Sequence, residues 1–178
     1  MTLENQLEII IPTYNRKNYL QHTLSRLLEE KSPVKNVSIT VLDNHSTDGT
    51  AEYVEQLSAR YPNVKHVRHA INIGGNANIA YAFTIVQKEY YWLLADDDDY
   101  DFSHWDKVEK AMRQACGLIV VNRELLPAKE SVRQAFLLRL LTFMPAAIHR
   151  KDTLTPEIMI NIYYNISNWF PHFAAVCA

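Results

Sequence analysis

Short apolar runs rich in β-branched and aromatic residues alternate with longer amphipathic stretches through the first half of the chain. This alternation predicts a parallel sheet covered by helices, because each run has the length of a strand and each stretch can form a crossover helix. The predicted strands are Leu7–Ile11, Val37–Leu42, Val64–Val67 and Tyr90–Ala95. The first, which ends before Pro12, and the last are expected to be buried, and the third is expected at an edge. The predicted fold class is α/β, with a mostly parallel, Rossmann-like sheet.

Apolar residues at helical spacing predict the helices between these strands. The expected helices are Lys17–Glu30, a helix capped by Thr47 or Asp48 that stops before Pro62, and Ala77–Val86. Farther along, the pattern predicts a helix over Trp105–Ala115, a strand over Leu118–Val121, a helix over Ser131–Leu141 and a helix that begins at Thr155 with Pro156 in its first position.

One later segment has two interpretations. The amphipathic stretch Ala135–Ile148 has Arg133, Arg139 and Arg150 nearby. It is either a buried helix with a polar edge or a helix that lies on a membrane surface.

Composition excludes several classes of protein. The 178 residues carry a formal net charge of −2, with no run of Lys and Arg longer than a pair, so we expect no nucleic-acid partner. Two cysteines, Cys116 and Cys177, are too few for a disulfide framework, and Met1–Glu8 lacks the pattern of a signal peptide. A membrane-spanning helix needs about 18 consecutive apolar residues, and no stretch of this sequence approaches that length. A cytoplasmic protein with reduced thiols is expected.

Glycine is scarce, and this excludes several common chemistries. With four glycines, the chain has no dinucleotide-binding glycine loop, no Walker A loop and no nucleophile elbow around a serine. The seven histidines include no His-Glu-x-x-His pair, so a zinc site is not expected.

Polar segments follow all four predicted strands of the first half. These segments are Pro12–Arg16, Asp43–Thr50, Asn72–Asn76 and Asp96–Asp99. Ligands of an open parallel sheet bind at the carboxyl ends of its strands, where the four segments are expected to meet. A nucleotide fits across such an edge.

Four consecutive aspartates after a buried strand are the sharpest of these signals. Adjacent carboxylates repel one another, and a divalent cation such as Mn²⁺ or Mg²⁺ would compensate the run, together with phosphate oxygens. The alternative is a solvated acidic turn. Asp43 is either an acid that accepts hydrogen bonds from a nucleoside or the cap of a turn. Gly74 and Gly75 either permit close approach of a ligand or form a turn before a helix, and Tyr14 and Trp92 are expected to be packing residues.

The order of these motifs resembles the family 2 glycosyltransferases, which have the GT-A fold. The motifs are Ile10-Ile11-Pro12-Thr13-Tyr14-Asn15-Arg16, Asp43-Asn44-x-Ser46-x-Asp48-Gly49-Thr50, Asn72-x-Gly74-Gly75-Asn76 and Trp92-Leu93-Leu94-Ala95-Asp96-Asp97-Asp98. The resemblance implies one GT-A domain over residues 1–178, with a nucleotide-sugar-binding half (1–100) and an acceptor half (101–178). It also implies an inverting enzyme that uses a nucleotide diphosphate sugar, with uridine as the usual base, and a divalent cation.

The resemblance assigns roles to individual residues. Pro12, Thr13 and Asn15 would line the nucleoside pocket, Asp43 would bind the base, Asn72 and Gly74 would border it, Asp96 and Asp97 would face ribose and diphosphate, and Asp98 would bind the Mn²⁺ or Mg²⁺ ion. A register shifted by one residue would make Asp97 and Asp99 the pair instead.

Inversion needs a general base that takes the proton of the acceptor hydroxyl. The acidic pair that is usual late in the family's catalytic domain does not occur after residue 120, and His172, in a Phe-Pro-His segment, is the candidate, with Asp152 and Glu157 as alternatives. The Gln-x-x-Arg-Trp motif of processive members is missing, which favours transfer of one sugar to a saccharide or lipid-linked acceptor in surface polysaccharide biosynthesis. The apolar, abrupt C-terminus would suit a chain cut from a longer one. A non-catalytic nucleotide-sugar-binding module is the alternative function, and a nucleotidyltransferase is disfavoured because the first loop is not glycine-rich and basic.

Overall fold

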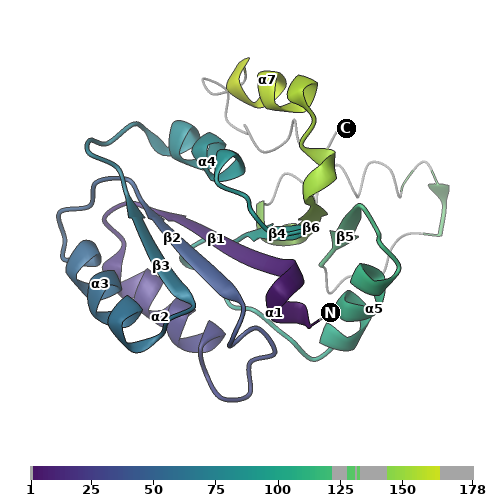
Figure 1. Cartoon of the computed structure of the whole chain (residues 1–178), viewed down its shortest axis with the longest axis horizontal. Helices are drawn as coiled ribbons and strands as arrows, with labels where there is room; N and C mark the ends of the chain where they lie inside the picture. Colours follow the sequence, from purple (N-terminus) through teal and green to yellow (C-terminus); the bar gives the residue numbers. More distant parts are fainter. Residues whose placement is uncertain (1, 122–127, 131, 133–143, 165–178) are drawn as a thin grey trace.

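Six strands and the helices that connect them form the part of the chain that the computed structural model describes, residues 2–121, 128–130, 132 and 144–164 (Figure 1). The strands are β1 (Leu7–Thr13), β2 (Ser38–Asp43), β3 (Val64–Arg68), β4 (Tyr90–Leu93), β5 (Leu118–Val120) and β6 (Ala147–Arg150). The α-helices are α1 (Leu3–Gln6), α2 (Lys17–Leu27), α3 (Thr50–Arg60), α4 (Gly75–Thr84), α5 (Trp105–Arg113) and α7 (Pro156–Tyr164). Two 3₁₀ helices are η1 (Met144–Ala146) and η2 (Lys151–Thr153).

The strands form one sheet in the order β3-β2-β1-β4-β6-β5. Strands β1 to β4 run parallel to one another, as predicted, and β6 runs antiparallel to both β4 and β5. From β1 the chain moves outward to β2 and β3, and then returns to place β4 on the other side of β1. This reversal makes the carboxyl ends of β1 and β4 a topological switch point, where open α/β sheets bind ligands.

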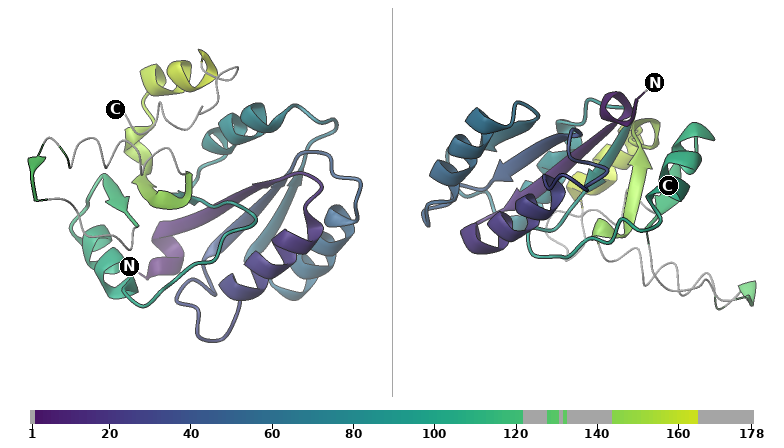
Figure 2. Two further views of the ribbon diagram at one scale, coloured as in Figure 1. Left: turned by 180° about the vertical axis from the view of Figure 1, so that it is seen from behind. Right: turned by 90° about the horizontal axis from the view of Figure 1, so that it is seen from below.

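Helices cover both faces of the sheet, and alternate residues of the central strand serve the two layers (Figures 1 and 2). Ile9 and Ile11 of β1 belong to the larger core, which also contains apolar residues of α2, α3 and α5. Ile10 belongs to the second core, together with residues of α4 and α7. All three isoleucines are fully buried, because strands flank β1 on both edges and helices cover both of its faces.

Strand β1 continues through Pro12 to Thr13, so the prediction that the proline ends the strand is wrong. The Leu94 N–H donates to the Ile10 carbonyl, which shows that the even-numbered residues of β1 turn their backbone groups toward β4. The next rung of that ladder would need an N–H on Pro12, which proline lacks. The β1–β4 pairing therefore stops at Ile10 and Leu93, while the β1–β2 pairing runs on to Thr13.

Helix boundaries differ from the predictions by a few residues. Helix α3 begins at Thr50 rather than directly after Asp48, although Asp48 still accepts a hydrogen bond from the Thr50 N–H (3.1 Å). Helix α4 begins at Gly75, two residues before the predicted start. Helix α7 begins at Pro156, as predicted.

The amphipathic segment Ala135–Ile148 is not helical at its C-terminal end. Residues Ala147 and Ile148 belong to β6 and are buried, because β6 lies between β4 and β5. Neither helical interpretation therefore applies to these two residues. The predicted helix Ser131–Leu141 and the positions Arg133 and Arg139 lie outside the described residues, apart from 132. Within the described ranges, no helix has the length and apolar character needed to cross a membrane.

Replacement of a core residue of α2 tests the packing of the larger core. Leu24 is fully buried in the larger core, so Leu24→Ala should lower the free energy of unfolding by about 2 to 5 kcal/mol through lost burial and a residual cavity. Asn18→Ala, at an exposed position of the same helix, is the control and should change it by less than about 0.5 kcal/mol. Urea denaturation measures both, and equal effects would contradict the packing described here.

Candidate nucleotide-sugar site

The buried carboxylate of Asp96 lies at the switch point and receives its partners from β1 and α2. Its Oδ2 accepts a hydrogen bond of 2.6 Å from the Thr13 hydroxyl, and its backbone carbonyl accepts one of 2.9 Å from the Thr23 hydroxyl. The Arg16 Nε lies 3.0 Å from Oδ1, although its N–H is not directed at that oxygen, so this contact is an ion pair. Burial raises the pKa of Asp96, while the Thr13 hydrogen bond and the Arg16 charge act in the opposite direction.

The other three aspartates of the run have three different environments. Asp97 is partly exposed and pairs with the Arg16 guanidinium. Asp99 is 81% exposed and lies 2.9 Å from Nε2 of His22 on α2. Asp98 is partly buried, and its Oδ2 is inaccessible to solvent and has no hydrogen-bond partner. Burial and the neighbouring carboxylates of Asp97 and Asp99 raise the pKa of Asp98.

The orphaned oxygen of Asp98 fits a hard cation better than the other carboxylates do, because it is the one not already paired. In the described part of the chain, no group of three or more His, Cys, Asp or Glu side chains is arranged to hold a metal ion. An ion at Asp98 would therefore need further oxygen ligands from phosphate groups or water, which is how Mg²⁺ is commonly bound beside nucleotides.

The loop after β1 is hydrogen-bonded to the loop after β2. Asn15 adopts a left-handed backbone conformation (φ 52°), which asparagine tolerates better than most residues. Its N–H donates to the Ser46 hydroxyl (2.9 Å), and its side-chain oxygen accepts from the Thr47 N–H (2.7 Å). The Lys17 N–H donates to the Asp48 carboxylate (2.9 Å). The Asn15 side chain thus fixes the relative position of two loops.

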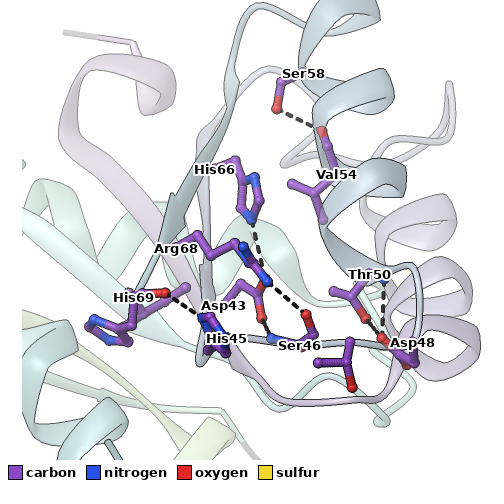
Figure 3. Close-up of polar contacts among 12 residues, drawn as sticks. Asp43, His45, Ser46, Asp48, Thr50, Val54, Ser58, His66, Arg68 and His69 are labelled. Carbon is purple, nitrogen blue, oxygen red and sulfur yellow. Dashed lines mark hydrogen bonds and ion pairs between the residues drawn. The ribbon is translucent and has the colours of Figure 1, made fainter. Parts of the chain in front are cut away.

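Asp43 ends β2 and is the centre of a buried polar network (Figure 3). Its side chain has no exposed surface. One carboxylate oxygen accepts from the Ser46 N–H (2.9 Å), and the other accepts from Arg68 Nε (3.2 Å) and lies 3.6 Å from His66 Nε2. Arg68 also donates to the Ser46 carbonyl (2.9 Å). Burial alone would raise the pKa of Asp43, but the contacts with His66 and Ser46 outweigh it and hold the pKa at about 2.

A pair of asparagines connects the loops after β2 and β3. The buried Asn44 donates to the Asn72 side-chain oxygen (2.9 Å) and accepts from the Ile73 N–H (2.9 Å). The Asn72 oxygen also accepts from the Gly74 N–H (2.8 Å). Gly74 has φ +88° and precedes α4, and a Cβ built on it would meet nothing within 4 Å. Gly74 thus forms the turn before a helix, and the space beside it is open.

The four loops therefore meet at one edge of the sheet, as predicted.

Two expectations about aromatic residues have opposite outcomes. Trp92 is buried and donates to the Pro145 carbonyl (2.8 Å), which confirms it as a packing residue. Tyr14 is 42% exposed beside the strand end, so it is not a buried packing residue as Trp92 is. The partly buried Pro12 precedes Thr13 at the same strand end.

The candidates for the general base have separate outcomes. His172 lies outside the described residues. Asp152 comes directly after β6, and the last residue of β6, Arg150, is the register partner of Tyr90 at the start of β4. Asp152 therefore lies at the sheet edge opposite the aspartate run, which follows the end of β4. It is also held by Arg150 at 2.7 Å. The alternative role for Asp152 is therefore wrong. Glu157 is exposed in the first turn of α7.

Sequence reasoning assigned no role to Arg16 or Arg68, which hold the two buried acids of the site. Arg16 was inside a recognised motif, but a motif does not reveal which carboxylate an arginine reaches. Arg68 had a clearer signal: it ends β3 as Asp43 ends β2, and the two residues are register partners with side chains on the same face.

Acid titration of the folded protein tests the Asp43 network. The pKa of Asp43 is lowered from 3.8 to about 2, so its stabilising contribution is complete above about pH 4 and is lost as the pH falls toward 2. This contribution amounts to about 2 kcal/mol. In denaturation measured from pH 7 to pH 2, Asp43→Asn should lose that much less stability than the unmodified chain. Glu55→Gln, at an exposed position of α3, should follow the unmodified chain. Parallel curves for Asp43→Asn and the unmodified chain would contradict the network.

Comparison with known proteins identifies the family. The family model described as Glycosyl transferase family 2 matches residues 8–175. The chain is 30% identical over 93 residues to abequosyltransferase RfbV of Salmonella typhimurium, which covers 52% of this chain and 28% of that protein. It is 28% identical over 95 residues to the poly(ribitol-phosphate) beta-glucosyltransferase of Bacillus spizizenii, which covers 53% of this chain and 15% of that protein. The chain thus spans under a third of the length of these relatives.

Solved structures show the same fold. The S. aureus TarS 1–349 structure in complex with UDP-GlcNAc matches with a TM-score of 0.65 and 21% identity, over 84% of this chain and 46% of TarS. The mannosyltransferase PcManGT from Pyrobaculum calidifontis, in complex with GDP-Man and Mn²⁺, matches with a TM-score of 0.61 and 18% identity, over 84% of this chain and 45% of that one. The fold is the GT-A fold, and the family match over nearly the whole sequence means that the chain belongs to glycosyl transferase family 2.

Proposed function

We propose that the chain transfers one sugar from a nucleotide diphosphate donor, with a UDP-sugar as the first candidate, to a saccharide or lipid-linked acceptor. The proposed reaction inverts the anomeric centre, depends on a divalent cation and belongs to surface polysaccharide biosynthesis. The observation that carries this proposal is the aspartate run at the switch point, where Asp96 is held by Thr13 and Arg16 and Asp98 keeps an unpaired oxygen.

The nucleoside is assigned to the edge formed by the loops after β1, β2 and β3. Its proposed neighbours are Pro12, Thr13, Asn15, Asp43, Asn72 and Gly74. The exposed Tyr14 and the open space beside Gly74 support this assignment. Because Arg68, Ser46 and His66 cover Asp43, direct contact between Asp43 and a base requires the Arg68 side chain to move aside. Without that movement, the base would meet the exposed part of Arg68 instead.

The diphosphate is assigned to the aspartate run, with Asp96 and Asp97 facing ribose and diphosphate and Asp98 binding Mn²⁺ or Mg²⁺. The exposure of Asp99 and its contact with His22 support this register over the one shifted by a residue. When bound, the cation would act as a Lewis acid on the leaving diphosphate, where negative charge develops. Arg16 carries a positive charge at the same place, on a side chain that is 40% exposed.

The acceptor and its general base are assigned to the later part of the chain. His172 remains the proposed base, which would take the proton of the acceptor hydroxyl on the face opposite the diphosphate. A peripheral contact with a membrane, where a lipid-linked acceptor would reside, also remains a proposal. Support for the pathway comes from relatives such as the poly(ribitol-phosphate) beta-glucosyltransferase.

Paired substitutions in the aspartate run test the metal site. Asp98→Asn should lower kcat/KM for the donor by about 100-fold or more, because the Lewis acid loses its protein ligand. Asp99→Asn should change it by less than about threefold, since Asp99 is largely exposed. Transfer or donor hydrolysis is measured at saturating Mn²⁺. The reverse pattern would favour the shifted register, and near-normal activity in both variants would overturn the metal assignment.

A thermal-shift panel of UDP, GDP, CDP and ADP, each with and without Mn²⁺, tests donor binding. A nucleotide present at 100 times its Kd should raise the melting temperature by about 5 to 10 °C, because it binds only the folded state. One nucleotide should stand out, and its effect should require the metal. A shift without any turnover of the matching sugar donor would favour the non-catalytic binding module. The absence of a shift with all four nucleotides would contradict the proposed donor site.

A further inference from the structure

Among the described residues, Arg16 supplies the arginine or lysine charge that contacts the aspartate run. It comes from the start of α2, and its guanidinium contacts both the buried Asp96 and the partly exposed Asp97. The same guanidinium lies over the ring of Tyr19, 4.6 Å from the ring centroid, and that tyrosine is 58% exposed. Arg16 is thus held at the surface by groups on two sides, and the run is partly neutralised without any bound ion.

Two details show that this pairing is not optimal. The Nε of Arg16 lies 3.0 Å from Asp96 Oδ1, but its N–H is not directed at that oxygen. The side chain of Arg16 is also 40% exposed, so water competes for its remaining N–H groups. A partner with several charged oxygens in a planar or tetrahedral group would engage the guanidinium better, and arginine binds phosphate in this way.

The pairing has a consequence for free metal ions. The Arg16 guanidinium is paired with Asp97, the residue before Asp98. A divalent cation that approaches Asp98 is therefore repelled by the positive charge of Arg16. Arg16 therefore weakens the attraction of the run for a free cation. A donor diphosphate brings negative charge of its own, so it can attract Arg16 and the cation together.

We propose that Arg16 serves as the counter-charge of Asp96 and Asp97 in the donor-free protein and turns to bind the diphosphate when the donor binds. Free divalent cation consequently binds poorly alone and well together with the nucleotide. This inference rests on the proposed donor site.

Two binding measurements on Arg16→Gln test the inference, and the expected effects have opposite signs. Mn²⁺ alone, titrated by electron paramagnetic resonance, should bind about tenfold more tightly to Arg16→Gln, because a repulsive charge is removed. The second measurement is a calorimetric titration with UDP, or with GDP if the thermal-shift panel selects it, at saturating Mn²⁺. Arg16→Gln should bind this nucleotide about tenfold more weakly, because a phosphate partner is lost. Arg16→Lys keeps the charge and should leave the Mn²⁺ affinity within about threefold of the unmodified chain.

Arg26→Gln is the matched control. Arg26 lies on the same helix, and its ion pair is with the exposed Glu29, so neither affinity should change. Weaker binding of both Mn²⁺ and nucleotide by Arg16→Gln, with an unchanged melting temperature, would mean that Arg16 merely shapes the loop and would overturn the inference. Unchanged affinities would overturn it as well. If the unmodified chain binds neither nucleotide nor Mn²⁺ with nucleotide, the proposed function itself fails.

Discussion

A buried carboxylate at the carboxyl end of the central strands is the constraint on which the arrangement of the site depends. Asp96 has little exposed surface, and an ionised group in such a place needs charge and hydrogen-bond partners. Those partners come from β1, through Thr13, and from the start of α2, through Arg16. The end of β1, the first turn of α2 and the segment after β4 are therefore held at the same point. Any ligand of the aspartate run binds to a surface that is organised before it arrives.

The same principle extends across the edge of the sheet. Asn15 joins the first loop to the second, and Asn44 joins the second to the third. Asp43 forms a second buried anion, compensated by Arg68 and His66 from the neighbouring edge strand. Loops usually move more than the elements that they connect. Here, side-chain hydrogen bonds between successive loops substitute for the backbone ladder beyond the point where the strands end.

Much of the fold follows from local patterns, because strands that are buried on both faces are apolar runs and their crossover helices have regular periodicity. The first four strands are the clearest case. Strand β6 was missed because Ala147–Arg150 is short and follows a stretch with helical spacing, and its place between β4 and β5 depends on pairing with distant residues. The meeting of the loops was predictable from the parallel topology. Arg68 could also have been inferred as a partner of Asp43, because the two residues end neighbouring parallel strands in register. The contact of Arg16 with Asp96 could not, since this arginine reaches its carboxylate from a loop and the spacing of residues does not encode that direction.

Pro12 determines where β1 and β4 separate. In the middle of a sheet, a missing N–H usually weakens a ladder, but here it falls where β1 and β4 separate. With any other residue at position 12, the backbone could form another rung, and the two strands could remain paired closer to the aspartates. The point at which these two strands separate is thus determined by the covalent chemistry of the backbone rather than by the surrounding side chains. The loops that follow the strands can diverge in sequence, and with them the choice of substrate, while the point at which the sheet opens stays the same.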